Sequence, residues 1–128
     1  MKLLLDTHAL IWAMEDNPRL SDNAIAAISQ VEWACFVSVV SLWEMAIKRS
    51  LGKLRLPDTW LQELEDSRRD NGLGLLPVSA AHCGRIDGLP FHHRDPFDRM
   101  LVAQALEEGL SIVSADANLD AYGVERIW

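Results

Sequence analysis

Residues 2–6 (KLLLD) run directly into residues 7–12 (THALIW). The leucines form an apolar run without polar alternation, which is typical of a strand buried on both faces, as in a parallel sheet. This strand ends in a carboxylate, and open α/β folds place their sites at the carboxyl edge of the sheet. We therefore expect a central strand that brings Asp6 to a site at this edge.

The composition bounds the size and the surroundings of the protein. The chain has 128 residues, of which 49% are hydrophobic, so we predict a single domain over residues 1–128. No stretch approaches the ~20 apolar residues of a membrane span. Asp6 also interrupts the opening run before it could form the core of a signal peptide. We therefore expect a cytoplasmic protein with no membrane contact.

The charge of the chain argues against general binding to nucleic acid. Its net charge is −7, and such binding depends largely on Lys and Arg side chains that neutralise phosphates. A basic cluster at residues 48–55 and two arginines, Arg94 and Arg99, are local exceptions. We interpret the basic cluster as a solvated face that also closes a helix C-terminus.

Strand and helix patterns alternate along the chain. Strands are predicted at residues 2–6, 34–40, 73–78, 110–114 and 124–127. Helices are predicted at residues 7–14, 21–29, 41–50, 57–71, 80–86 and 95–109, with a helical turn at 118–122. This alternation predicts an α/β fold with a mainly parallel central sheet flanked by helices.

Three details of this pattern locate elements more closely. Pro77 places the strand at 73–78 at an edge of the sheet, because proline cannot donate to a ladder. Ser41 and Glu44 have the spacing of a capping box that opens a helix. Asp95 as N-cap, followed by Pro96, makes the helix after it the best-specified one in the chain.

Four carboxylates occupy comparable places in this layout. Asp6 and Asp116 follow predicted strands, and Glu44 and Asp98 lie in the first turn of predicted helices. Each could be a simple cap, but strand ends and helix starts share one edge of a parallel sheet, so the four can converge. They would then repel one another unless a cation lay among them. Carboxylate ligands alone favour a hard cation, Mg²⁺ or Mn²⁺.

Four segments match a known set of motifs in the expected order. They are LLDTHA at 4–9, SLWE at 41–44, HRDPFDRMLVAQA at 93–105 and IVSAD at 112–116. Together they resemble the successive signatures of PIN-domain ribonucleases, most closely the VapC-type toxins of bacterial toxin–antitoxin pairs. The resemblance spans nearly the whole chain, and the run DPFDR at 95–99 is its most specific part.

The resemblance implies a PIN-like three-layer fold and an endoribonuclease that hydrolyses RNA phosphodiesters with Mg²⁺ or Mn²⁺. The family's acidic residues fall on Asp6, Glu44, Asp98 and Asp116. Asp6 and Asp98 are then direct metal ligands. Glu44 and Asp116 remain open as ligands through water, as ligands of a second metal, or as the base that acts on the attacking water.

Polar neighbours of the metal follow from the same resemblance. They fall on Thr7 and Ser114, and Asp95 is close enough to act there in addition to its role as N-cap.

The resemblance also implies partners. A toxin of this kind has a cognate antitoxin, whose tail we expect to wrap an apolar groove lined by Trp12 and Trp43. The tail should insert an Arg or Lys toward the carboxylates. Five tryptophans exceed what one small core readily hides, and with the likeness to dimeric toxins this predicts a homodimer.

Other functions fit the residues less well. A receiver-type signalling domain matches in length, fold class and acidic pocket, but it needs paired acids after the first strand and a late lysine, whereas the last lysine is Lys53. A phosphoaspartate hydrolase needs a second acid where His8 stands. A PIN-like scaffold that binds RNA or a partner without cleaving it stays open, although all four acids are present.

The cysteines and histidines give only a weak metal signal. Cys35 and Cys83 fit no disulfide framework or ligand spacing, and we predict reduced thiols. A zinc site from Cys83, His82, His92 and His93 is disfavoured, because neighbouring His82 and Cys83 chelate jointly with difficulty.

Overall fold

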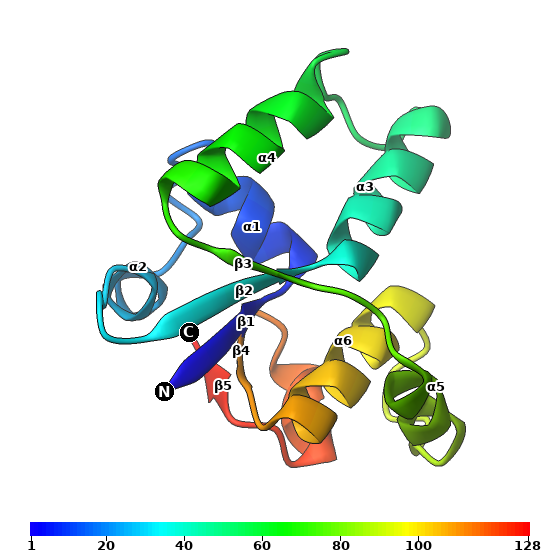
Figure 1. Ribbon diagram of the computed structural model, residues 1–128. Helices are drawn as coiled ribbons and strands as arrows, with labels where there is room; N and C mark the ends of the chain where they lie inside the picture. The colour runs from blue at the N-terminus through cyan, green and yellow to red at the C-terminus, as the bar shows by residue number, and fades with distance from the viewer.

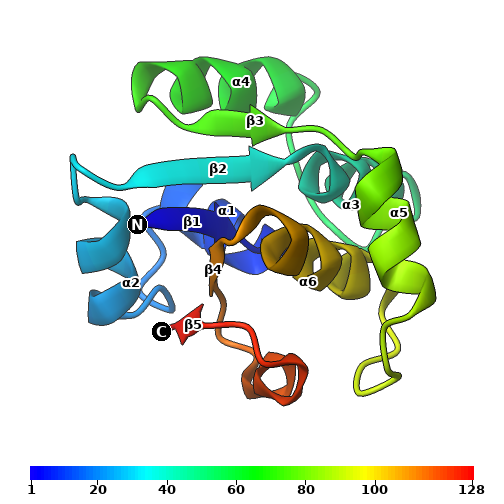
Figure 2. The same ribbon diagram turned by 60° about the horizontal axis from the view of Figure 1, so that its bottom comes forward.

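Five parallel strands form one central sheet in the computed structural model (Figure 1), which describes residues 1–128. They are β1 (Lys2–Leu5), β2 (Ala34–Ser38), β3 (Gly74–Leu76), β4 (Ser111–Val113) and β5 (Arg126–Ile127). Their order is β3-β2-β1-β4-β5, as Figure 2 shows. The predicted central position of β1 and edge position of β3 are therefore confirmed. Since every pairing is parallel, all carboxyl ends meet at one edge.

Helices cover both faces of this sheet (Figure 1). They are α1 (Thr7–Met14), α2 (Asp22–Ile28), α3 (Val39–Ser50), α4 (Trp60–Asp70), α5 (Ala80–Asp87), α6 (Pro96–Glu108) and the short 3-10 helix η1 (Ala117–Tyr122). This arrangement is the predicted three-layer α/β fold. No helix of the protein is long and apolar enough to cross a membrane.

The protein has a hydrophobic core on each face of the sheet, and the leucines of β1 belong to both. Leu3 and Leu5 pack with α1, α2 and α4 on one face, whereas Leu4 packs with α6 and η1 on the other. Because successive side chains of a strand point to opposite faces, an unbroken apolar run is what a doubly covered strand requires. Packing on both faces of the sheet therefore fixes the position of β1 and of the carboxyl edge at which it ends.

Helix α6 forms as its local sequence predicts. Asp95 Oδ1 accepts hydrogen bonds from the backbone N–H of Phe97 at 2.8 Å and of Asp98 at 3.2 Å, and Pro96 occupies the first turn. Gly109 ends the helix in the left-handed region, at φ 65°. The cap places Asp98 at the N-terminus of α6, pointing toward the carboxyl edge of the sheet.

The boundary between β2 and α3 differs from the prediction. Helix α3 starts at Val39, and its cap is Ser38, whose Oγ accepts from Val40 N–H at 3.0 Å. Val39 and Val40 favour strand by their branching, but Ser38 Oγ also donates to Gln104 Oε1 at 2.6 Å and is fixed there. The predicted capping box of Ser41 and Glu44 is therefore wrong, and Glu44 lies in the second turn rather than the first.

The structure tests the predictions for the cysteines and shows how far each tryptophan is buried. Cys35 and Cys83 are free, as predicted. Four tryptophans pack against the core that contains α1 but remain only partly buried: Trp12, Trp33, Trp60 and Trp128. Trp43 is different, because it remains 58% exposed.

Candidate active site

Asp6 connects β1 to α1 at the carboxyl edge of the sheet. Its carboxylate caps α1 by accepting from Ala9 N–H at 2.8 Å, and only 6% of the residue is exposed. Burial raises the pKa of Asp6 above its usual value, and the nearby Glu44 carboxylate raises it further. Hydrogen bonds from Ser114 and Ala9 offset part of this rise in the pKa. Asp6 is thus a carboxylate that the fold places where its charge is costly.

The pKa of Asp98 is raised even more strongly than that of Asp6. Burial raises the pKa of Asp98 to about 7, and the carboxylates of Asp95, Glu44 and Asp6 add to the rise. Its contact with a basic group is His93 Nε2, 3.5 Å from Asp98 Oδ2. The Glu44 carboxylate raises the pKa of both Asp6 and Asp98, so these three acids lie close enough to repel one another.

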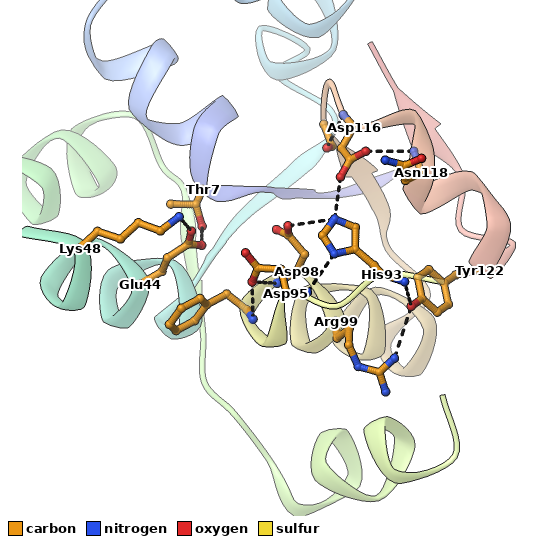
Figure 3. A network of polar contacts seen from close by, with 12 residues as sticks. Thr7, Glu44, Lys48, His93, Asp95, Asp98, Arg99, Asp116, Asn118 and Tyr122 are labelled. Carbon is orange, nitrogen blue, oxygen red and sulfur yellow. Dashed lines mark hydrogen bonds and ion pairs between the residues drawn. The ribbon is translucent and has the colours of Figure 1, made fainter. Parts of the chain in front are cut away.

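Glu44 extends into this site from α3, with only 3% of the residue exposed. Its Oε1 accepts a hydrogen bond from Thr7 Oγ1 at 2.7 Å, and its Oε2 forms an ion pair with Lys48 (Figure 3). The hydrogen bond to Glu44 raises the pKa of Lys48. Lys48 is therefore part of the site, and its interpretation as part of a solvated basic face is wrong. The spacing of four residues on one helix is a signal that could have revealed this pair.

Asp116 reaches the same region from the segment after β4. Its Oδ1 caps η1 by accepting from Asn118 N–H at 3.0 Å, and its Oδ2 lies 2.9 Å from His93 Nε2. The buried Ser114 Oγ accepts from Asp116 N–H at 3.0 Å. The predicted polar neighbours thus contact the acids directly: Thr7 contacts Glu44, and Ser114 contacts Asp116.

His93 is the site residue that the sequence argument dismissed. Its Nε2 lies between the carboxylates of Asp98 and Asp116, and ligand atoms of these three residues lie within 4.8 Å of one another. Its place at the start of the motif at 93–105, two residues before Asp95, was the available signal. The alternative zinc site does not assemble, because His82 binds Glu108 and His92 packs on Tyr122.

The residues fit a hard divalent cation. The ligands on offer are mainly carboxylate oxygens, which Mg²⁺ and Mn²⁺ prefer. Burial raises the pKa values of Asp6 and Asp98, and repulsion from neighbouring carboxylates adds to the rise. A cation bound between them would relieve that repulsion.

Comparison with known proteins identifies the family. The PIN domain family matches residues 3–125 of the chain. The chain belongs to the PIN-domain family. It is also 30% identical over 124 residues to ribonuclease VapC22 of Mycobacterium tuberculosis, covering 94% of this chain and 91% of that protein. The expected family is thereby confirmed, which removes the receiver-type and phosphoaspartate alternatives.

Solved structures of VapBC complexes contain chains with the same fold. The chain aligns with a chain of VapBC2 from Rickettsia felis bound to a promoter DNA fragment, with a TM-score of 0.75, 14% identity and full coverage of both chains. It aligns with VapBC-5 from Mycobacterium tuberculosis at a TM-score of 0.61 and 21% identity, over 98% of this chain and 97% of the other. The PIN-like fold is therefore confirmed.

Proposed function

We propose that this PIN-domain protein is an endoribonuclease that hydrolyses RNA with Mg²⁺ or Mn²⁺ and acts as the toxin of a toxin–antitoxin pair. The observation that carries the proposal is the pair Asp6 and Asp98, two buried or partly buried carboxyl groups with raised pKa values, of which Asp98 also lies within 4.8 Å of ligand atoms of His93 and Asp116. The likeness to ribonuclease VapC22 supports the substrate class. We propose that residues 1–128 form one PIN domain and act in the cytoplasm, where the RNA is.

The contacts of the four acids support different roles for them. Both carboxylate oxygens of Glu44 are already engaged by Thr7 and Lys48. Both oxygens of Asp116 are likewise engaged, by Asn118 and by His93. Asp98 accepts no comparable pair of bonds. Asp6 accepts from the Ala9 N–H and from Ser114, but these bonds only partly offset the rise in its pKa.

We therefore assign direct metal ligation to Asp6 and Asp98. A bound divalent cation supplies charge neutralisation at the phosphoryl group and activation of water. Glu44, which Thr7 and Lys48 hold in place, orients the attacking water and accepts its proton. Asp116, which Asn118 and His93 hold in place, binds the metal through water. Asp95 caps the N-terminus of α6 and adds negative charge beside Asp98.

The chemistry of the cleaved ends tests this mechanism. Water as nucleophile leaves a linear phosphate on one end of each fragment, whereas attack by the ribose 2′-hydroxyl leaves a 2′,3′-cyclic phosphate. We expect only linear phosphates, and mass spectrometry of the fragments from a short synthetic RNA would show this. Cyclic phosphate ends would contradict hydrolysis by a water that the carboxylates orient.

An antitoxin partner is the second part of the proposal, and the solved relatives are complexes of VapBC proteins. The Lys48 ion pair with Glu44 illustrates that the acidic site accepts a basic side chain. An Arg or Lys of the antitoxin would approach Asp6 and Asp98 in the same way and compete with the metal.

The predicted path of the antitoxin, along a groove lined by Trp12 and Trp43, stays a prediction. An apolar groove lies between α1, α2 and α4, and neither Trp12 nor Trp43 lines it. Trp12 packs on Trp128, and Trp43 packs on Phe97. Coexpression with the neighbouring reading frame tests the partnership: we expect growth arrest by the toxin alone and relief by the antitoxin. Replacing the inserted basic residue by Ala should restore cleavage within the assembled complex.

A further inference from the structure

His93 has a ring orientation that the structure defines at both nitrogens. Its Nδ1 accepts a hydrogen bond from the backbone N–H of Asp95 at 3.1 Å. A ring nitrogen that accepts such a bond carries no proton, so the proton of the neutral imidazole is on Nε2. The Nε2–H group points into the acidic site, where it lies 2.9 Å from Asp116 Oδ2 and 3.5 Å from Asp98 Oδ2.

The backbone of His93 is fixed as well. Its N–H donates to the Tyr122 hydroxyl at 2.9 Å, and the side chain is only 18% exposed. Tyr122 belongs to η1, the element that Asp116 caps through its other oxygen. His93 therefore joins the N-terminus of α6 to η1. Figure 3 shows its ring beside Asp98 and Asp116 and its backbone N–H beside the Tyr122 hydroxyl.

We propose that His93 is a positioning residue that donates its Nε2–H to Asp116, holds that carboxylate beside Asp98, and is not itself a metal ligand. The inference rests on the proposed metal-dependent function. Asp116 is tied at Oδ1 by Asn118 N–H and at Oδ2 by His93, so both the position and the tilt of its carboxylate are set. Partners of this kind orient carboxylates at metal sites, and their loss typically weakens metal binding about 10- to 100-fold.

The tautomer of His93 is the first test. Nitrogen-15 NMR of the histidine rings in the metal-free protein at pH 8 should show the proton of His93 on Nε2. Addition of Mg²⁺ should leave it there. A proton on Nδ1, either before or after Mg²⁺ is added, would mean that Nε2 is free to bind metal and would overturn the inference.

The affinity for Mn²⁺ is the second test, measured by calorimetry on variants whose fold is checked by circular dichroism. His93→Ala should weaken Mn²⁺ binding about 10- to 100-fold. His93→Gln should recover much of the affinity, because its amide can donate from nearly the position of Nε2. His92→Ala is the matched control and should bind as the wild type does, since His92 packs on Tyr122 outside the acidic site.

The results separate this inference from the proposed function. A wild type that binds Mn²⁺ and cleaves RNA, with a His93→Ala variant of equal affinity, would overturn the role of His93 alone. The same holds if His93→Gln binds no better than His93→Ala. If His93→Ala does not fold, the comparison of His93→Gln with His92→Ala decides. A wild type that binds no Mn²⁺ would overturn both proposals.

Discussion

Thr7 Oγ1 donates a hydrogen bond to Glu44 Oε1 over 2.7 Å, which joins the first turn of α1 to the second turn of α3. Both side chains are buried, and Ser41 Oγ lies 3.0 Å from the same hydroxyl. With Lys48 on its other oxygen, Glu44 is fully engaged before any substrate or metal arrives. A buried carboxylate without such partners would be strongly destabilising.

Loss of the Lys48 charge should destabilise the metal-free protein. We expect Lys48→Met to lower the free energy of unfolding by about 1–2 kcal/mol. Breaking a buried pair costs about 3–5 kcal/mol, but the Lys48 side chain is 33% exposed and partly screened. Urea denaturation in EDTA would measure the loss, with the exposed Lys53→Met as control. Mn²⁺ should reduce the difference, because a cation replaces the lost charge. Equal stability of the two variants would contradict this account of Glu44.

The stability of the metal-free protein should fall as the pH rises from 5 to 8. The pKa of Asp98 is raised to about 7 in the folded protein, so the folded state retains a proton that the unfolded state has lost. Such a group contributes stability at low pH that disappears as the pH passes through its folded pKa. The raised pKa of Asp6 acts in the same direction. Melting curves across this range would measure the decline.

Asp98→Asn should flatten this decline and raise the stability of the metal-free protein at pH 8, because it removes one of the repelling charges. Mg²⁺ or Mn²⁺ should raise the melting temperature of the wild type most at the alkaline end, where Asp98 is ionised. A wild type and variant with the same pH profile, both indifferent to these metals, would argue against a shared acidic site.

A homodimer remains a prediction. In the structure, its main support is one tryptophan that is largely exposed. Trp43, which is 58% exposed and packs on Phe97, is the aromatic side chain that needs a covering surface near the site. We expect sedimentation at tens of micromolar to show a dimer, and Trp43→Ser to shift it toward monomer. Val31→Ser, at an exposed position before β2, is the control. A wild-type monomer at that concentration would contradict the prediction.

Local signals explain why so much of the fold could be predicted from the sequence. The leucines of β1 and the Asp95–Pro96 cap of α6 act through their own neighbours, so the strand and the helix follow from short-range rules. The start of α3 could not be found in this way. It depends on Ser38, whose hydroxyl is fixed by Gln104, 66 residues away.

The residues of the candidate site also separate into those that short-range sequence rules predict and those that depend on contacts with distant residues. Asp6 and Asp98 could be placed because each follows a strand end or opens a helix at a known edge of the sheet. His93 could not, because its role depends on Asp116, 23 residues later, and on the orientation of its ring. Lys48 lies between these cases, since its partner Glu44 is one helical turn away.

Cleavage of a defined RNA by the wild type and by Asp98→Asn, in saturating Mn²⁺ and in excess EDTA, tests the central claim most directly. The substitution is nearly isosteric at the start of α6, so the fold should survive. Asp87→Asn changes an exposed carboxyl group on α5 and serves as the matched control. We predict that Asp98→Asn and EDTA each lower the rate by about two orders of magnitude or more, while Asp87→Asn cleaves as the wild type does. Full cleavage by Asp98→Asn, or by the wild type in EDTA, would contradict a carboxylate-held metal as the centre of this ribonuclease.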